Sequence, residues 1–390
     1  MTDADRPSSY DTLVREVRKF KPIPLLRRLA ALTGQQMWRK GSMLNQDDLM
    51  YPWAASLVAR EALAAPGPGR TGRSVSLKVA QDRDLARLNA LVVSLDDPIT
   101  GGPTAGLDDW LVRIAFQQFP YQQPVFHNLA RLRPMLNRRY PRPRYQILDR
   151  SLIERLVGAD IDTFVDTAPF FGAAIKRNAG VFNPAWLSGP QFEPVFERIS
   201  SEQLLRVFER MWASDLRALR GAAREGRSQE SWLRQYDYDP LLSTPFVGLP
   251  GGEHICPQAW FAASRIGLSA IYCAGIRDGI GSALATDLGH LHEDYCLDQM
   301  RQLLGRATVD GEIIYDPNGN KATVDVIVVT PEVCWLIEVK STRVSLAAQK
   351  SFSSYVTLLT RDVGKGFEQL GDNCQPHQVR PPSPRWRCPP

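Results

Sequence analysis

Apolar residues recur at intervals of three and four through most of the first 236 residues, which is the spacing of an amphipathic helix. The clearest example is the segment 201–212, SEQLLRVFERMW, where Ser200 and Gln203 supply the side chains of a capping box at the start. Gly and Pro interrupt the helical pattern in two loops, 65–72 and 96–103. We therefore predict a mainly helical region over residues 1–236.

The pattern changes after residue 236, where apolar segments become shorter and are separated by residues typical of turns. In chain order, it predicts a turn at 250–252, helices over 257–276 and 283–304, strands over 307–315, 322–329 and 333–340, and a helix over 346–370. These elements indicate an α/β region over 237–371. The tail, 372–390, is rich in Pro and Arg, and we predict that it is disordered.

Composition narrows the class of protein without naming a function. The chain has 390 residues, of which 44% are hydrophobic and 23% charged, and this excludes a wholly disordered, collagen-like or coiled-coil chain. Its formal net charge is +5, with basic residues in excess before residue 240 and acidic residues in excess after it. We therefore expect the two parts of the chain to meet different chemistry.

Cysteine usage and hydropathy indicate the cellular compartment. The six cysteines are scattered and form no Cys-x-x-Cys pair, which favours reduced thiols over a structural zinc site. The amino terminus has no apolar segment of the kind that a secretory signal needs, and no apolar run approaches the length that spans a bilayer. We expect a cytoplasmic protein with no membrane partner.

Two predicted strands each carry a charge in an otherwise apolar run. Asp325 is the one charged residue in 323–329, and Glu338 and Lys340 lie two apart on the next strand, so they point to the same face. If the strands form a hairpin centred on residues 331–332, Asp325 lies directly opposite Glu338. The sequence therefore predicts two neighbouring carboxylates within a sheet.

Neighbouring carboxylates across two strands destabilise a sheet unless a cation lies between them. Carboxylate oxygens of this kind suit Mg²⁺ or Mn²⁺, and the Lys340 ammonium would reach the same place to orient a water molecule or help to deprotonate it. This set of groups suits metal-assisted hydrolysis of a phosphodiester. A plain salt-bridged hairpin is the alternative, because short motifs arise frequently by chance.

At these residues the sequence resembles the PD-(D/E)xK nuclease superfamily, whose restriction-endonuclease-like core contains a helix, three antiparallel strands, a helix and a fourth strand. Asp325 matches the aspartate of the motif, and Glu338 and Lys340 match its E-x-K. The resemblance implies that Val339 lends a backbone carbonyl to the metal and that Glu293, on the preceding helix, completes or tunes the site. It also implies a Mg²⁺- or Mn²⁺-dependent nuclease that acts on DNA.

The resemblance covers residues 284–371 and departs from the family at two points. Val324 stands where the name of the motif has proline, and the segment after residue 370 does not have the pattern of the fourth strand. We therefore predict an α/β fold with a core that lacks its fourth strand. The alternative function is a catalytically degenerate nuclease-like protein that binds nucleic acid or serves in assembly.

A basic run between residues 131 and 145 combines arginine with tyrosine and holds no acidic residue. Its arginines are Arg131, Arg133, Arg138, Arg139, Arg142 and Arg144, with Tyr140 and Tyr145 among them. Arginine binds phosphates and tyrosine can stack on bases, so we predict a nucleic-acid-binding surface here. A second basic cluster contains Arg15, Arg18, Lys19, Lys21, Arg27 and Arg28. For both, the alternative is a solvated helix face.

Two weaker motifs have ordinary interpretations. His290, His292 and Asp294 match part of the metallo-β-lactamase signature, but they fall in a helical pattern where two surface histidines are expected. The segment 67–74 has the spacing of a phosphate-binding loop with Arg73 in place of lysine, and a flexible linker is the simpler interpretation.

Overall fold

The computed structural model describes residues 9–38, 48–65, 77–95, 111, 115, 121, 125–314, 322–340 and 352–374. The chain divides into two compact units, the first made of 1–285 and 345–354 and the second of 286–344 and 355–390. The boundary therefore falls later than the one that the sequence pattern suggested after residue 236. Within the described ranges, no helix combines the length and the apolar content that crossing a bilayer requires.

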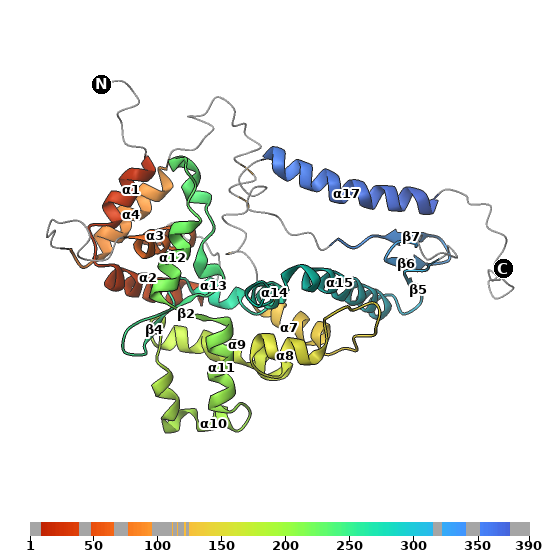
Figure 1. Cartoon of the computed structure of the whole chain (residues 1–390), viewed down its shortest axis with the longest axis horizontal. Helices are drawn as coiled ribbons and strands as arrows, with labels where there is room; N and C mark the ends of the chain where they lie inside the picture. The colour runs from red at the N-terminus through yellow and green to blue at the C-terminus, as the bar shows by residue number, and fades with distance from the viewer. Residues whose placement is uncertain are drawn as a thin grey trace, which may run out of the picture. The chain divides into compact units, whose positions relative to one another are not determined.

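The first unit is mainly helical up to residue 236, as the sequence pattern predicts (Figure 1). Its helices are α1 (Ser9–Val17), α2 (Pro22–Met37), α3 (Pro52–Ala64), α4 (Asp82–Val93), α7 (Val125–Leu136), α8 (Arg150–Val157), α9 (Ile161–Arg177), α10 (Glu193–Phe196), α11 (Ser201–Met211), α12 (Leu216–Glu225), α13 (Ala259–Ser264) and α14 (Leu268–Arg277). The capping box of α11 is confirmed: the Gln203 amide donates to Ser200 Oγ at 3.1 Å, and the Ser200 amide donates to Gln203 Oε1 at 3.3 Å. The helix predicted over 257–276 is two helices, because α13 ends at Ser264 and the chain extends at Gly267.

A small four-stranded sheet also belongs to the first unit, and the sequence pattern did not indicate it. Its strands are β1 (Val181–Phe182), β2 (Ala213–Asp215), β3 (Phe246–Gly248) and β4 (His254–Ile255), in the order β1-β4-β3-β2. Strands β2 and β3 are parallel, and the other neighbours are antiparallel. The β3–β4 turn uses Gly251 and Gly252, both at positive φ, which confirms the turn predicted at 250–252.

Aromatic side chains fill the space between this sheet and helices α9 and α11. Phe171, Phe182, Phe208, Trp212 and Phe246 are all fully buried. Their rings interlock, with centroids 4.9 Å apart for Phe171 and Trp212 and 5.1 Å apart for Phe208 and Phe246. Rings at such separations attract one another beyond the gain from burial alone. This cluster holds the short strands in place despite their length.

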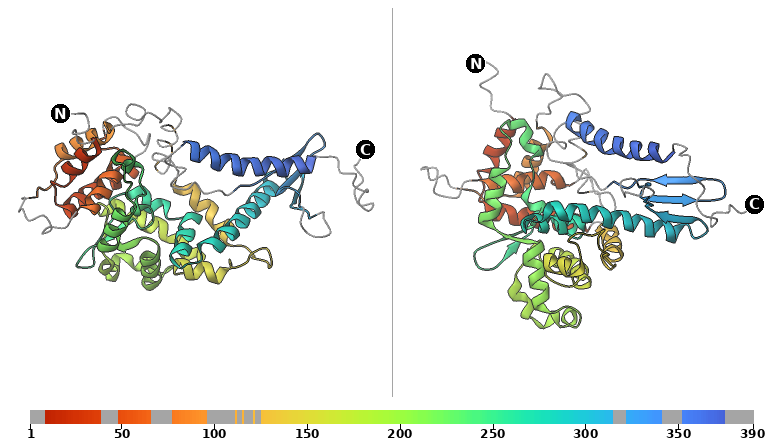
Figure 2. Two further views of the ribbon diagram at one scale, coloured as in Figure 1. Left: turned by 45° about the horizontal axis from the view of Figure 1, so that its top comes forward. Right: turned by 45° about the vertical axis from the view of Figure 1, so that its right-hand side comes forward.

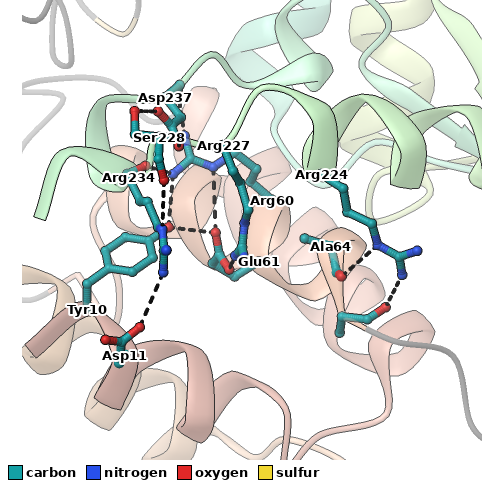
Figure 3. Close-up of polar contacts among 11 residues, drawn as sticks. Tyr10, Asp11, Arg60, Glu61, Ala64, Arg224, Arg227, Ser228, Arg234 and Asp237 are labelled. Carbon is teal, nitrogen blue, oxygen red and sulfur yellow. Dashed lines mark hydrogen bonds and ion pairs between the residues drawn. The ribbon is translucent and has the colours of Figure 1, made fainter. Parts of the chain in front are cut away.

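A network of buried charges joins α3 to the segment that follows α12 (Figure 3). Arg60 and Glu61 of α3 are 4% and 3% exposed. Arg60 donates to the backbone carbonyls of Arg234 and Asp237, and Arg227 forms an ion pair with Glu61. The Tyr10 hydroxyl donates to Glu61 Oε1 at 2.6 Å. Each buried charge therefore has a partner, as removal from water requires.

The second unit has the order helix, three antiparallel strands, helix that the sequence pattern predicts (Figure 2). Helix α15 (Gly281–Leu303) enters it from the first unit, and strands β5 (Thr308–Gly311), β6 (Val326–Val329) and β7 (Cys334–Ile337) and helix α17 (Phe352–Cys374) follow. The strands form one sheet in the order β5-β6-β7. The chain is therefore of the α/β class, with strands shorter than those predicted.

A compact apolar core supports this sheet. Val309, Val326 and Val328 are buried in it, and Leu297 and Met300 of α15 pack against them. No fourth strand is found among the residues described in this unit. Helix α17 continues to Cys374, so the first residues of the predicted tail are helical, and the rest of the tail lies outside the described residues, as do 67–74.

Candidate active site

The β6–β7 hairpin has the register that the sequence predicts. Val329 pairs with Cys334 and Val326 with Ile337, so the next position outward places Asp325 beside Glu338. Hydrogen bonds between Thr330 and Val333 close the turn. In one of them the Thr330 amide donates to the Val333 carbonyl at 2.9 Å. Because one residue of slip would move every side chain to the opposite face, this register decides that the two carboxylates share one face.

Asp325, directly before β6, is fixed by the backbone that follows β7. The Val339 amide donates a hydrogen bond to Asp325 Oδ2 at 2.6 Å. Burial, aided by the negative charges of Glu293 and Glu338, raises the pKa of Asp325 to about 6 against the opposing effects of the Val339 amide and the Lys340 ammonium. The structure thus brings Asp325, Glu293, Glu338 and Lys340 into one electrostatic neighbourhood.

Glu338 is more enclosed than Glu293. Its side chain is 7% exposed, and Oε1 forms an ion pair with Lys340 Nζ. The other oxygen, Oε2, is buried and has no hydrogen-bond partner among the described residues. A buried carboxylate oxygen in that position is costly unless a donor or a cation reaches it.

Helix α17 approaches the site at a glycine. A Cβ atom at Gly366 would lie 3.6 Å from Glu338 Cγ and 3.8 Å from Lys340 Cε. The helix can come this close because Gly366 has no side chain. Sequence reasoning missed Gly366, since nothing in the helical pattern marks which residue faces the site.

Helix α15 contributes the third acid. Glu293 Oε2 lies 3.0 Å from His290 Nδ1, so this glutamate has a partner on its own helix. Burial raises the pKa of the nearby Cys296, and Asp325 and Glu293 raise it further. Cys296 was also missed, because one cysteine in a helical pattern resembles a core residue. The structure places His290 and His292 within α15, so the metallo-β-lactamase interpretation lacks the preceding strand that it requires.

The donor set at the hairpin suits one divalent cation held by two acids. Among the described residues, no group of three His, Cys, Asp or Glu side chains is arranged to hold a metal ion. Asp325 and Glu338 supply two carboxylates, and the unsatisfied Oε2 of Glu338 together with the raised pKa of Asp325 marks an excess of negative charge. A cation would relieve both, and the Val339 carbonyl is the further oxygen that the motif implies.

The predicted nucleic-acid surface over residues 131–145 is only partly available. Arg133 is bound to Asp162 and Asp166 at 2.8 and 2.9 Å, and Arg142 lies 3.7 Å from Asp149. Asp162 and Asp166 belong to α9, and Asp149 caps the start of α8. The spacing of residues in the sequence does not show that α9 lies close to Arg133.

The tyrosines of this run are structural. Tyr145 is fully buried, with its ring centroid 5.2 Å from that of Tyr140, whose hydroxyl donates to the Leu136 carbonyl at 2.6 Å. The expectation that Tyr145 stacks on bases is therefore wrong. The alternation of arginine and tyrosine reflects packing at the end of α7. Of the six arginines, Arg131 and Arg139 are exposed and form no ion pair with a described residue.

The second basic cluster is largely neutralised. Lys19 pairs with Glu16 at 2.6 Å, and Arg27 and Arg28 form ion pairs with Glu253 and Asp82. These contacts favour the interpretation of a solvated surface over that of a binding surface.

Comparison with models of protein families, with curated proteins and with solved structures gives no match. The resemblance to the PD-(D/E)xK superfamily therefore rests on the motif residues of this one chain.

Proposed function

We propose that the protein is a Mg²⁺- or Mn²⁺-dependent nuclease that hydrolyses phosphodiester bonds, with DNA as its substrate. The observation that carries the proposal is the junction of Asp325, Glu338 and Lys340 at one end of the β6–β7 hairpin, with Glu293 close enough to perturb Asp325. This arrangement supports the proposal, because the resemblance implies that two acids and a lysine act together at such a hairpin. The choice of DNA as substrate comes from the resemblance.

Asp325 and Glu338 would hold the cation through their carboxylates, together with the Val339 carbonyl. When bound, such a cation supplies positive charge that polarises the phosphodiester and favours deprotonation of water. Asp325 keeps its orientation because the Val339 amide holds Oδ2, which leaves Oδ1 to bind.

Lys340 and Glu293 act on the electrostatics of the same place. The Lys340 ammonium, paired with Glu338, orients the attacking water and stabilises negative charge that develops on the phosphate. Glu293 raises the affinity of the group for a cation by adding negative charge near Asp325. It acts as a positioning residue, since His290 holds its carboxylate.

The test is cleavage of plasmid DNA by the purified full chain with Mg²⁺ or Mn²⁺. We expect the wild type to cut and the variants Asp325→Asn and Lys340→Ala to lose at least about a hundredfold in rate, the order of effect found when one group of a charge-stabilising site is removed. Glu332→Gln, which removes an exposed carboxylate from the turn of the same hairpin, is the matched control. Equal cleavage by all variants, or no cleavage by folded wild type, contradicts the proposal and favours a nuclease-like binding or assembly protein.

A further inference from the structure

The first unit carries a groove that the proposed nuclease site does not use. It has a volume of about 1250 Å³ and lies between α12, the end of β2 and the β3–β4 hairpin. Arginines of α12 form one wall, and Gly248, Pro250 and His254 belong to the opposite wall. The sequence did not indicate this groove, because the wall opposite α12 comes from strands too short to show a pattern.

The arginines of this wall form a single row. Arg217, Arg220 and Arg224 are three and four residues apart and therefore lie on one face of α12. At a rise of about 1.5 Å per residue, the row extends for roughly 10 Å along the helix. Arg224 is fixed, since its guanidinium donates to the carbonyls of Ala64 and Ala65 at 3.1 and 3.0 Å (Figure 3).

Arg217 and Arg220 have no acidic partner among the described residues. The Nε atom of Arg220 is buried and has no hydrogen-bond partner there. Burial lowers the pKa of Arg220, and the charge of Arg224 lowers it further. Two neighbouring arginines repel each other, and burying the unpaired Nε–H of Arg220 costs free energy. A bound anion would offset both effects.

The acids of the groove do not neutralise this row. Asp215 Oδ1 accepts the Ala218 amide at 2.8 Å and so caps α12. The negative charge of Glu209 acts on His254, whose pKa it raises. Burial lowers the pKa of His254, and its Nδ1 has no partner among the described residues. The lining thus offers an anion two arginine side chains and one imidazole.

We infer that this groove binds the sugar–phosphate backbone of a single nucleic-acid strand, with Arg217 and Arg220 on the phosphates. Its volume exceeds what one phosphate group fills, and its row of charge is linear. Among the described residues that line the groove there is no Phe, Tyr or Trp on which bases could stack, so the contacts are to phosphates and binding is independent of sequence. Binding in this groove does not require cleavage, so it does not depend on the proposed nuclease function.

The inference is tested by fluorescence anisotropy with the full chain, a labelled thymidine oligonucleotide and EDTA, so that cleavage cannot affect the result. In Arg217→Gln/Arg220→Gln we expect the dissociation constant to rise about tenfold or more and the salt dependence of log K to fall by roughly 1.4, since each contact with a single strand contributes about 0.7. The matched control is Arg83→Gln/Arg87→Gln, which removes the same charge from α4 and leaves both quantities unchanged.

Three results of the binding assay, and one of a competition assay, would overturn the inference. The first three are unchanged binding in the groove variant with a native circular dichroism spectrum, an equal loss in the control variant, and equal binding of polyglutamate, which would make the groove a general site for polyanions. Inorganic phosphate and a mononucleotide serve as competitors. Displacement of the oligonucleotide by either at equal phosphate concentration shows a site for a single phosphate and contradicts a backbone groove.

Discussion

The backbone amide of Val339 donates a hydrogen bond to Asp325 Oδ2 at 2.6 Å, across the two strands of the β6–β7 hairpin. This bond fixes the acid that precedes β6 against the residue that separates Glu338 and Lys340 after the end of β7. Three chemically distinct groups thereby share one end of the sheet, where Asp325 directly precedes β6 and Glu338 to Lys340 directly follow β7. Catalysis by positioning requires a site to hold its geometry, and here the paired strands β6 and β7 anchor the residues that flank them.

The raised pKa of Asp325 predicts how stability depends on pH when no metal is present. Its carboxyl titrates near pH 6 in the folded chain and at its ordinary value, 3.8, in the unfolded chain. The folded state therefore binds more protons between these values and loses stability as the pH rises through them. In EDTA, Asp325→Asn should be the more stable protein above pH 6, by on the order of 1 kcal/mol after allowance for partial exposure, and equal to wild type below pH 3.8.

Urea unfolding across this pH range measures the difference. Glu332→Gln is the control, and its difference from wild type should not change in the same interval. A gain in wild-type stability over Asp325→Asn as the pH rises from 4 to 6 would contradict the electrostatic account of the site.

Gly366 predicts a steric effect on the same centre. Leucine at this position would push against Glu338 Cγ and Lys340 Cε, the atoms within 4 Å of a Cβ there. We expect Gly366→Leu to abolish cleavage of plasmid DNA while α17 stays helical, because leucine has a higher helix propensity than glycine. Gly364→Leu is the matched control, since nothing lies within 4 Å of a Cβ at that position. Loss of activity in both variants, or in neither, would show that α17 does not pack against the site.

The buried charges of the first unit predict a large loss of stability when one partner is removed. Arg60→Ala leaves Glu61 and Asp239 buried with less compensation and should destabilise this unit by about 3–5 kcal/mol, the range for breaking a buried ion pair. Arg87→Ala removes an exposed arginine that lies 3.3 Å from Glu16, and it should cost well under 1 kcal/mol. Urea unfolding followed by circular dichroism compares them, and similar losses in both variants would contradict the network.

The second unit could be predicted from sequence where local periodicity carries the information. Alternation in the strands and the short turn at Pro331 fix the hairpin register, and this register alone places Asp325 opposite Glu338. The proximity of Gly366 could not be predicted, because it depends on how α17 packs on the sheet.

The first unit shows the opposite case. The capping box at Ser200 is local and was predicted, whereas β1 to β4 are too short to show alternation, and they form because long-range packing of Phe182, Phe246 and their neighbours holds them. The predicted stacking of Tyr145 on bases is wrong for a related reason. The burial of Tyr145 depends on tertiary packing at the end of α7, which its arginine-rich neighbours in the sequence do not reveal.

The central claim is that one divalent cation binds between Asp325 and Glu338. The most direct test is to measure Mn²⁺ binding to the full chain by electron paramagnetic resonance. The account predicts a saturable Mn²⁺ site in the wild type, displaced by Mg²⁺ and weakened at least about tenfold in Asp325→Asn and in Glu338→Gln, since each variant removes a charged ligand. Glu332→Gln should bind as the wild type does. Mn²⁺ affinity that is unchanged in both Asp325→Asn and Glu338→Gln would contradict the claim.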